Sequence, residues 1–122
     1  MSDPKKQLRP EILSIVQTGD FSALEKFQNE VLRPIIKLQH ELIIACFRHY
    51  LNKYKVQIVE LDFLQKTDLI TKLFKSDTQL KNDCRGLIIG LFTLEEYGEY
   101  LILSPQLNKR INNMIMQKLY YS

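Results

Sequence analysis

The sequence has no tryptophan, only four glycines and four prolines, and two each of cysteine and histidine among its 122 residues. So few glycines and prolines argue against a β sandwich, which needs turn residues at short intervals. Cys46 and Cys84 could form one disulfide, but neither their spacing nor their apolar helical surroundings suggest a secreted scaffold, so we expect a reducing, cytoplasmic location. His40 and His49 are nine positions apart, on opposite sides of one helix, and we predict no metal site and no cofactor.

Long apolar runs and strong net charge are also missing. The longest uncharged apolar run, 86–94, has nine residues, well short of the roughly 20 needed to span a bilayer. The N-terminal residues are polar and do not read as a signal peptide, so we expect no membrane partner. A net charge of +3 is low for a dedicated nucleic-acid binder. The composition predicts one globular domain, 1–122, with 1–8 as a flexible tail.

Helical periodicity and cap signals account for most of the chain. They predict an all-α, single-domain bundle of about six helices, in segments 10–16, 22–34, 35–54, 62–75, 77–92, 93–103 and about 104–120. Pro34 either kinks the second segment or starts the third. The segment 35–54 is apolar around more than half its circumference, so we predict that it is the central helix. The alternating run 55–61 has no second strand to pair with and is predicted to be a loop.

Three glycines, Gly86, Gly90 and Gly98, fall within segments that otherwise read as helix. Neither a dinucleotide-binding nor a P-loop spacing is present, and the host segment is too short for a membrane GxxxG face. We therefore predict that all three glycines serve helix packing, and that Gly86 and Gly90 form a groove for the close approach of another helix.

Polar side chains on apolar segments are the next candidates. Gln39 lies in the apolar arc of its helix and is predicted to bond a backbone group or another helix, with a ligand contact as the alternative. His49 shares a face with Cys46, and together with Gln39 it makes a candidate buried polar site. Glu95, Glu96 and Glu99 are expected to face water in the first turns of a helix. No nucleophile or acid–base motif is present, so we assign no catalytic residue.

The segment 93–113 resembles helix-turn-helix segments of transcriptional regulators. Thr93-Leu94-Glu95-Glu96 matches the start of the first helix, Gly98 the small residue, and Ser104-Pro105 the cap of the second. The resemblance implies groove contacts by Asn108, Lys109, Arg110, Asn112 and Asn113. Ile102 departs from the usual turn glycine, and the three glutamates would lie near phosphates.

Three further stretches, "EKFQNEVLRPIIKLQHELI", "RGLIIGLFTLEEY" and "LNKRI", look like a family of short, all-helical bacterial proteins, some of whose members are labelled glyoxalase. The glyoxalase fold has paired βαβββ units with histidine and glutamate metal ligands on strands. This sequence has neither those strands nor those histidines, so no site residue is carried over.

The last helix offers a candidate interface. Leu107, Ile111, Met114, Ile115 and Leu119 form the stripe predicted to face the core, and Met116 and Tyr120 lie on the other side, where they favour self-association. We therefore expect a non-catalytic helical protein that acts through protein–protein contacts, including a homodimer. The alternatives are a small DNA-binding protein that uses 93–113, with weak binding, and, third, an enzyme or small-ligand carrier.

Overall fold

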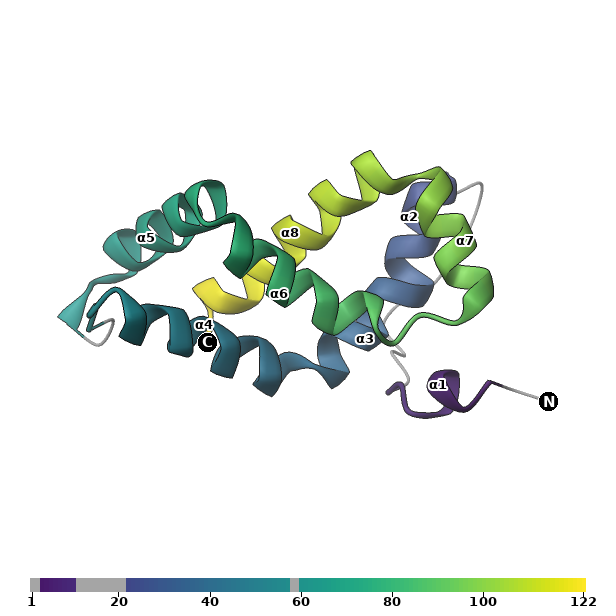
Figure 1. The fold of residues 1–122 in the computed structure, drawn as a ribbon, viewed down its shortest axis with the longest axis horizontal. Helices are drawn as coiled ribbons and strands as arrows, with labels where there is room; N and C mark the ends of the chain where they lie inside the picture. The colour runs from purple at the N-terminus through teal and green to yellow at the C-terminus, as the bar shows by residue number, and fades with distance from the viewer. Residues whose placement is uncertain (1–2, 11–21, 58–59) are drawn as a thin grey trace.

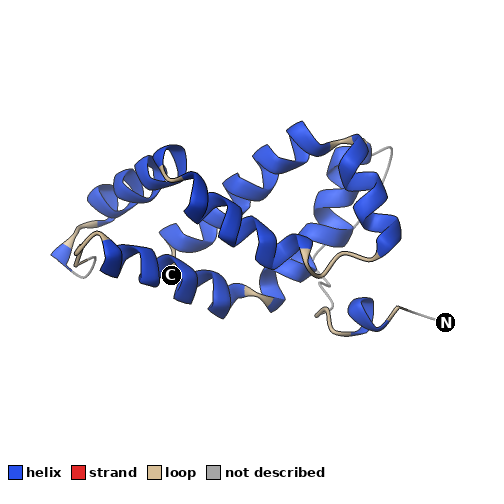
Figure 2. Cartoon of the chain, viewed as in Figure 1, coloured by secondary structure: helices blue, strands red, loops and turns tan. Residues whose placement is uncertain are grey.

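The computed structural model describes residues 3–10, 22–57 and 60–122, and in these ranges the chain is a single all-α domain without strands, as predicted (Figures 1 and 2). Its elements are α1 (Pro4–Gln7), α2 (Ala23–Phe27), the π-helical turn η1 (Gln28–Leu32), α3 (Arg33–Leu38), α4 (His40–Lys53), α5 (Phe63–Ser76), α6 (Thr78–Ile89), α7 (Leu94–Ile102) and α8 (Ser104–Tyr120). The helix predicted for 10–16 lies outside the described residues. None of the described helices is long and apolar enough to cross a membrane.

Side-chain caps fix where most of these helices begin. The Asp62 and Asp77 carboxylates accept backbone N–H groups at the starts of α5 and α6. Thr93 and Glu96 form the predicted capping box of α7, in which each side chain bonds the other residue's N–H. Ser104, predicted as the cap of the last helix, is instead its first residue, and no side chain caps that end. The α7–α8 connection is therefore the single residue Leu103.

Pro34 neither starts a separate helix nor produces an isolated kink. It lies in α3, directly after η1, where the Arg33 N–H bonds the Gln28 carbonyl five residues earlier. Proline has no N–H and clashes with the carbonyl four residues before it. A π turn widens the helix by one residue at that place, so the helix continues through the proline.

The predicted central helix 35–54 is divided in two. Gln39, with φ −92° and ψ 9°, separates α3 from α4, and α4 leaves Leu42, Arg48 and His49 exposed. Lys55, at φ 56°, ends α4 in the left-handed region, and the Val56 N–H bonds the Leu51 carbonyl there. These are features of a Schellman C-cap.

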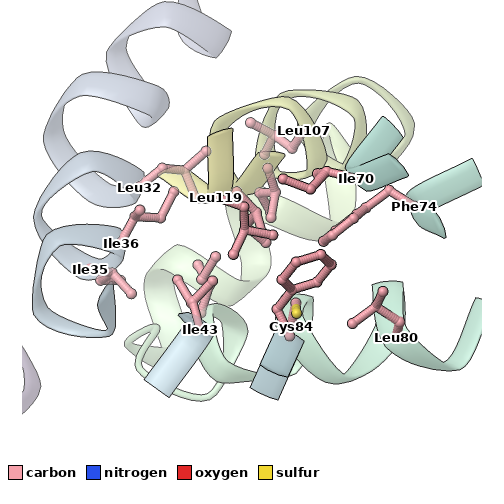
Figure 3. Packing of buried hydrophobic residues seen from close by; sticks show 14 of the residues in the cluster. Leu32, Ile35, Ile36, Ile43, Ile70, Phe74, Leu80, Cys84, Leu107 and Leu119 are labelled. Atoms are coloured by element: carbon pink, nitrogen blue, oxygen red, sulfur yellow. The ribbon is translucent and has the colours of Figure 1, made fainter. Parts of the chain in front are cut away.

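The central helix is α8. It contacts α4, α5, α6, α7 and η1, and four side chains spaced four residues apart, Leu107, Ile111, Ile115 and Leu119, have no exposed surface. Figure 3 shows Leu107 and Leu119 converging with Ile70, Phe74 and Cys84 from α5 and α6. The predicted core stripe of this helix is therefore confirmed. The prediction that 35–54 is the central helix was wrong.

Helices α4 and α6 run antiparallel, side by side. Gln39, before α4, donates its amide N–H to the Leu87 carbonyl near the end of α6. At the opposite end of the pair, Tyr50 and Tyr54 donate hydroxyl hydrogen bonds to Asp83 and Asp77. Polar contacts therefore hold both ends of this helix pair.

Candidate functional site

The surface of α7 carries a row of apolar side chains that no described residue covers. Leu94 is 92% exposed, Tyr97 43%, Leu101 56% and Ile102 81%, and the exposed Gly98 lies in the middle of the row. Their spacings of three and four residues place all five on one side of the helix. We call this set the α7 apolar face. Helix α7 lies at the same end of the molecule as α1 and α2 (Figure 1).

The opposite side of α7 is buried and partly polar. Glu96 and Tyr100 are its buried residues. The Tyr100 ring packs against Phe92 at 5.7 Å between centroids, and its hydroxyl donates a 2.5 Å hydrogen bond to Asn108 on α8. An ordinary surface helix buries its apolar side and exposes its polar side. In α7 a carboxylate occupies the buried side beside Tyr100, and four apolar side chains lie on the exposed side.

A buried ion pair fixes this orientation. The Arg9 guanidinium donates to both Glu96 carboxylate oxygens, at 2.8 and 2.6 Å, and to the Leu91 carbonyl at 2.7 Å. Both side chains are less than a tenth exposed. Glu96 Oε1 also accepts the Thr93 N–H. With this network in place α7 cannot rotate its apolar face inward without leaving two charges unpaired.

The pKa of Glu96 reflects its environment. Burial alone would raise this pKa, but the hydrogen bonds from Arg9 and the Thr93 N–H and the charge of Arg9 together lower it below the ordinary value. The carboxylate is therefore ionised at neutral pH. The prediction that Glu96 faces water was wrong, whereas Glu95 and Glu99 are exposed as predicted.

Residues 3–9 also contribute to this end of the molecule. Residues 4–7 form α1, capped by Asp3, Lys5 Nζ donates to the Phe92 carbonyl at 3.2 Å, and Arg9 follows. Asp3 and Lys5 therefore make specific contacts, and the flexible tail expected for 1–8 stays a prediction.

A groove lies next to the α7 apolar face, between α7 and the α2–η1 segment. Its volume is about 530 Å³. Ile102 connects it to the apolar face, and the charged residues that line it are Lys6, Lys26, Glu30, Glu95, Glu96 and Glu99. The apolar row is thus flanked by charges of both signs, as in the polar rim of a protein interface.

The glycine prediction was wrong about Gly86 and Gly90. Both are exposed, and a Cβ atom added at Gly86 would meet nothing within 4 Å; at Gly90 the nearest atom is the Gly86 carbonyl oxygen, at 3.1 Å. The buried residues of α6 are Leu80, Cys84 and Ile88, and a helical step of two residues is about 200°, so the glycines lie on the far side. Gly98 is also open, within the α7 apolar face.

The structure does not bring Gln39 and His49 together in one buried polar site. Gln39 bonds the Leu87 backbone carbonyl, as predicted, at 2.9 Å. His49 is exposed on α4, with its ring edge-on to Tyr50. The two residues therefore have separate surroundings.

Three of the five candidate nucleic-acid contacts are partly buried. Asn108 accepts the Tyr100 hydroxyl, Arg110 donates to Gln28 Oε1 at 2.7 Å, and Asn112 is half-buried with its side-chain oxygen enclosed. Lys109 and Asn113 are exposed. Because α8 is the central packed helix, it does not project as the recognition helix of a helix-turn-helix does.

Met116 and Tyr120 do not form the exposed pair predicted from the sequence. Both are partly buried against the core, and the Tyr120 hydroxyl lies 2.7 Å from Thr71 Oγ1 on α5. Helix α5 packs against this side of α8, so the helix buries two faces. These two residues are therefore not available as a self-association surface.

The α7 apolar face could not be selected from the sequence alone. Leu94, Tyr97, Leu101 and Ile102 have helical spacing, but so do Tyr100 and Leu103 on the other side. Only the partner of Glu96 decides which side is buried, and that partner is 87 residues away.

In the described part of the chain, no three histidine, cysteine, aspartate or glutamate residues gather where they could hold a metal ion. Compared with protein-family models, with curated proteins and with solved structures, the chain matches none. The resemblance to a family of short helical bacterial proteins therefore stays a prediction. The α7 apolar face is the feature of the structure that points to a function.

Proposed function

We propose that this chain is a non-catalytic helical protein that acts through protein–protein contacts, and that a second copy of the chain docks on the α7 apolar face. The observation that carries the proposal is the exposure of Leu94, Tyr97, Leu101 and Ile102 in one row. Single exposed apolar residues are common on monomers, but a contiguous row with a charged rim is typical of an interaction site.

The symmetry of the row supports a second copy as the partner. Leu94 and Ile102 are each four residues from Gly98. In an antiparallel pair of α7 helices crossing at Gly98, Leu94 would meet the partner's Ile102, and each contact would occur twice, as a twofold interface requires. Gly98 has no side chain, so the two helix backbones can approach closely at the crossing.

Helix α7 is too short to supply the whole area of a stable interface. Nine residues at 1.5 Å each make a helix about 14 Å long, and a standard interface buries roughly 800 Å² on each partner. The adjoining groove between α7 and the α2–η1 segment has to contribute the rest. Because lysines and glutamates both line this groove, the lysines of one copy can pair with the glutamates of the other.

The DNA-binding alternative has less support. Of its five proposed contact residues, only Lys109 and Asn113 are exposed, and the net charge is only +3. The single-residue connection between α7 and α8 is shorter than the 3–4-residue turn of a helix-turn-helix.

Light scattering over a protein concentration series tests the proposal. We expect a dimer that dissociates on dilution in the wild type and a folded monomer in the double variant Leu101→Lys/Ile102→Lys. The matched control is Leu64→Lys, which changes an exposed leucine on α5 and should leave the dimer intact.

Two results would contradict the proposal. One is a wild-type monomer at every concentration. The other is a large fall in the melting temperature of the double variant without any change in association, because it would mean that these side chains pack within their own chain.

A further inference from the structure

The two cysteines of the sequence meet across the α4–α6 helix pair. Cys46 lies on α4 and Cys84 on α6, 38 positions apart, with their Sγ atoms 3.9 Å from each other. Cys84 is fully buried and Cys46 is half-buried. Figure 3 shows Cys84 within the hydrophobic core. Both thiols are free.

Contacts on either side hold this spacing. The Gln39–Leu87 hydrogen bond lies on one side of the cysteine pair, and the Tyr50–Asp83 hydrogen bond lies on the other. Because these hydrogen bonds fix both ends of the helix pair, the positions of the two thiols are set by the fold and do not depend on side-chain rotation alone.

We propose that Cys46 and Cys84 are a redox modification site that forms an intramolecular disulfide with a small disulfide oxidant such as glutathione disulfide. The Sγ atoms must approach from 3.9 Å to the roughly 2.05 Å of a disulfide. Bond formation therefore requires rotation about the Cα–Cβ bonds and some closing of the helix pair.

The reaction proceeds by two exchanges. Cys46 is the more exposed thiol, so its thiolate attacks the oxidant, forming a mixed disulfide and releasing one glutathione thiol. The Cys84 sulfur then attacks Cys46 Sγ, forms the Cys46–Cys84 bond and releases the second glutathione. The protein loses two electrons and two protons, and both pass to the two glutathione thiols.

The surroundings make this reaction slow. Burial and the charge of Asp83 raise the pKa of the Cys46 thiol, although the hydrogen bond from Cys84 opposes them. Burial raises the pKa of the Cys84 thiol far above its ordinary range. Only a small fraction of either thiol is ionised at neutral pH, so we expect the exchange to be slow.

The disulfide would change the stability of the chain. It would close a loop that contains α5 and part of α4 and α6, and a cross-link of this length restricts the unfolded chain. We expect the melting temperature to rise by on the order of 10 °C on oxidation and to return with dithiothreitol. This proposal does not depend on the α7 apolar face.

The test is incubation of the folded full chain with glutathione disulfide, followed by intact mass, peptide mapping and thiol counting in denaturant. We expect the loss of both thiols, a mass lower by two hydrogen atoms, a linked Cys46–Cys84 peptide and the higher melting temperature. The variant Cys84→Ala should instead keep one glutathione on Cys46.

Three results would overturn the proposal: two thiols that stay free after prolonged incubation, a wild type that ends as a glutathione adduct, or a cross-link between chains on a non-reducing gel. The wild-type mass decides the question even where the Cys84→Ala variant fails to fold.

Discussion

Arg9 and Glu96, 87 residues apart, form a bidentate ion pair with almost no exposed side-chain surface. It ties the segment of α1 to the start of α7. It also determines that the other side of α7, with Leu94, Leu101 and Ile102, faces outward. The candidate interface is therefore a consequence of a contact that the helix itself does not reveal.

Removal of Arg9 should destabilise the fold strongly. Arg9→Ala leaves the Glu96 carboxylate buried without its cation, and breaking such a pair costs about 3–5 kcal/mol. Arg33→Ala is the matched control, because the Arg33 side chain is exposed and, among the described residues, hydrogen-bonds Asn29 alone. It should change the free energy of unfolding by less than about 1 kcal/mol. Urea unfolding measures both. Equal effects of the two variants would refute the structural role of the pair.

The same pair predicts a dependence of stability on acid. The folded-state pKa of Glu96 is below its ordinary value near 4.5, so its contribution is present above that value and is lost as the pH falls through the folded pKa. Glu96→Gln lacks this titration. The difference in unfolding free energy between the wild type and Glu96→Gln should therefore shrink steadily below about pH 4.5. A difference that stays constant down to pH 3 would mean that the pKa is not lowered.

The variant Gly98→Ala should stabilise the single chain but weaken the dimer. A Cβ at this position meets nothing within 4 Å in the single chain, so the substitution should stabilise α7 by up to about 1 kcal/mol. At a helix crossing the same methyl group would separate two backbones, and the dimer should weaken at least tenfold. Gly86→Ala is the control: it should also stabilise the chain but leave association unchanged. Identical behaviour of the two variants in sedimentation would argue against a crossing at Gly98.

Nucleic acid should bind only weakly and without sequence preference. Lys109 is the exposed cation among the candidate contacts, and one or two phosphate contacts give an affinity that salt readily removes. A gel shift at physiological salt should show no discrete complex, for the wild type or for Lys109→Ala. A sequence-selective complex at nanomolar concentration, lost in Lys109→Ala, would favour the DNA-binding alternative.

Local signals in the sequence predicted the fold class well. The Thr93–Glu96 capping box and the core stripe of Leu107, Ile111 and Ile115 depend on residues three or four positions apart, and both are present. Such features follow from helix geometry and need no knowledge of the neighbouring helices.

Features set by distant residues were not predictable in this way. Nothing near Glu96 indicates that Arg9 will neutralise it, and nothing near Met116 or Tyr120 indicates that α5 will cover them. The error at Gly86 and Gly90 has another origin: they share a side of α6, but that side is opposite Cys84 and Ile88. For all of these residues the sequence correctly predicted a helix, but it did not predict which face of the helix is buried.

Deuterium uptake of the α7 amides, compared at dilute and at concentrated protein, shows whether a second copy covers this helix. If two copies pair through the α7 apolar face, uptake by residues 94–102 should slow at high concentration, because dimer formation suppresses local opening of the helix. Uptake by α5, residues 63–76, should not change. Equal uptake by α7 at both concentrations, or slowing confined to another helix, would contradict the account.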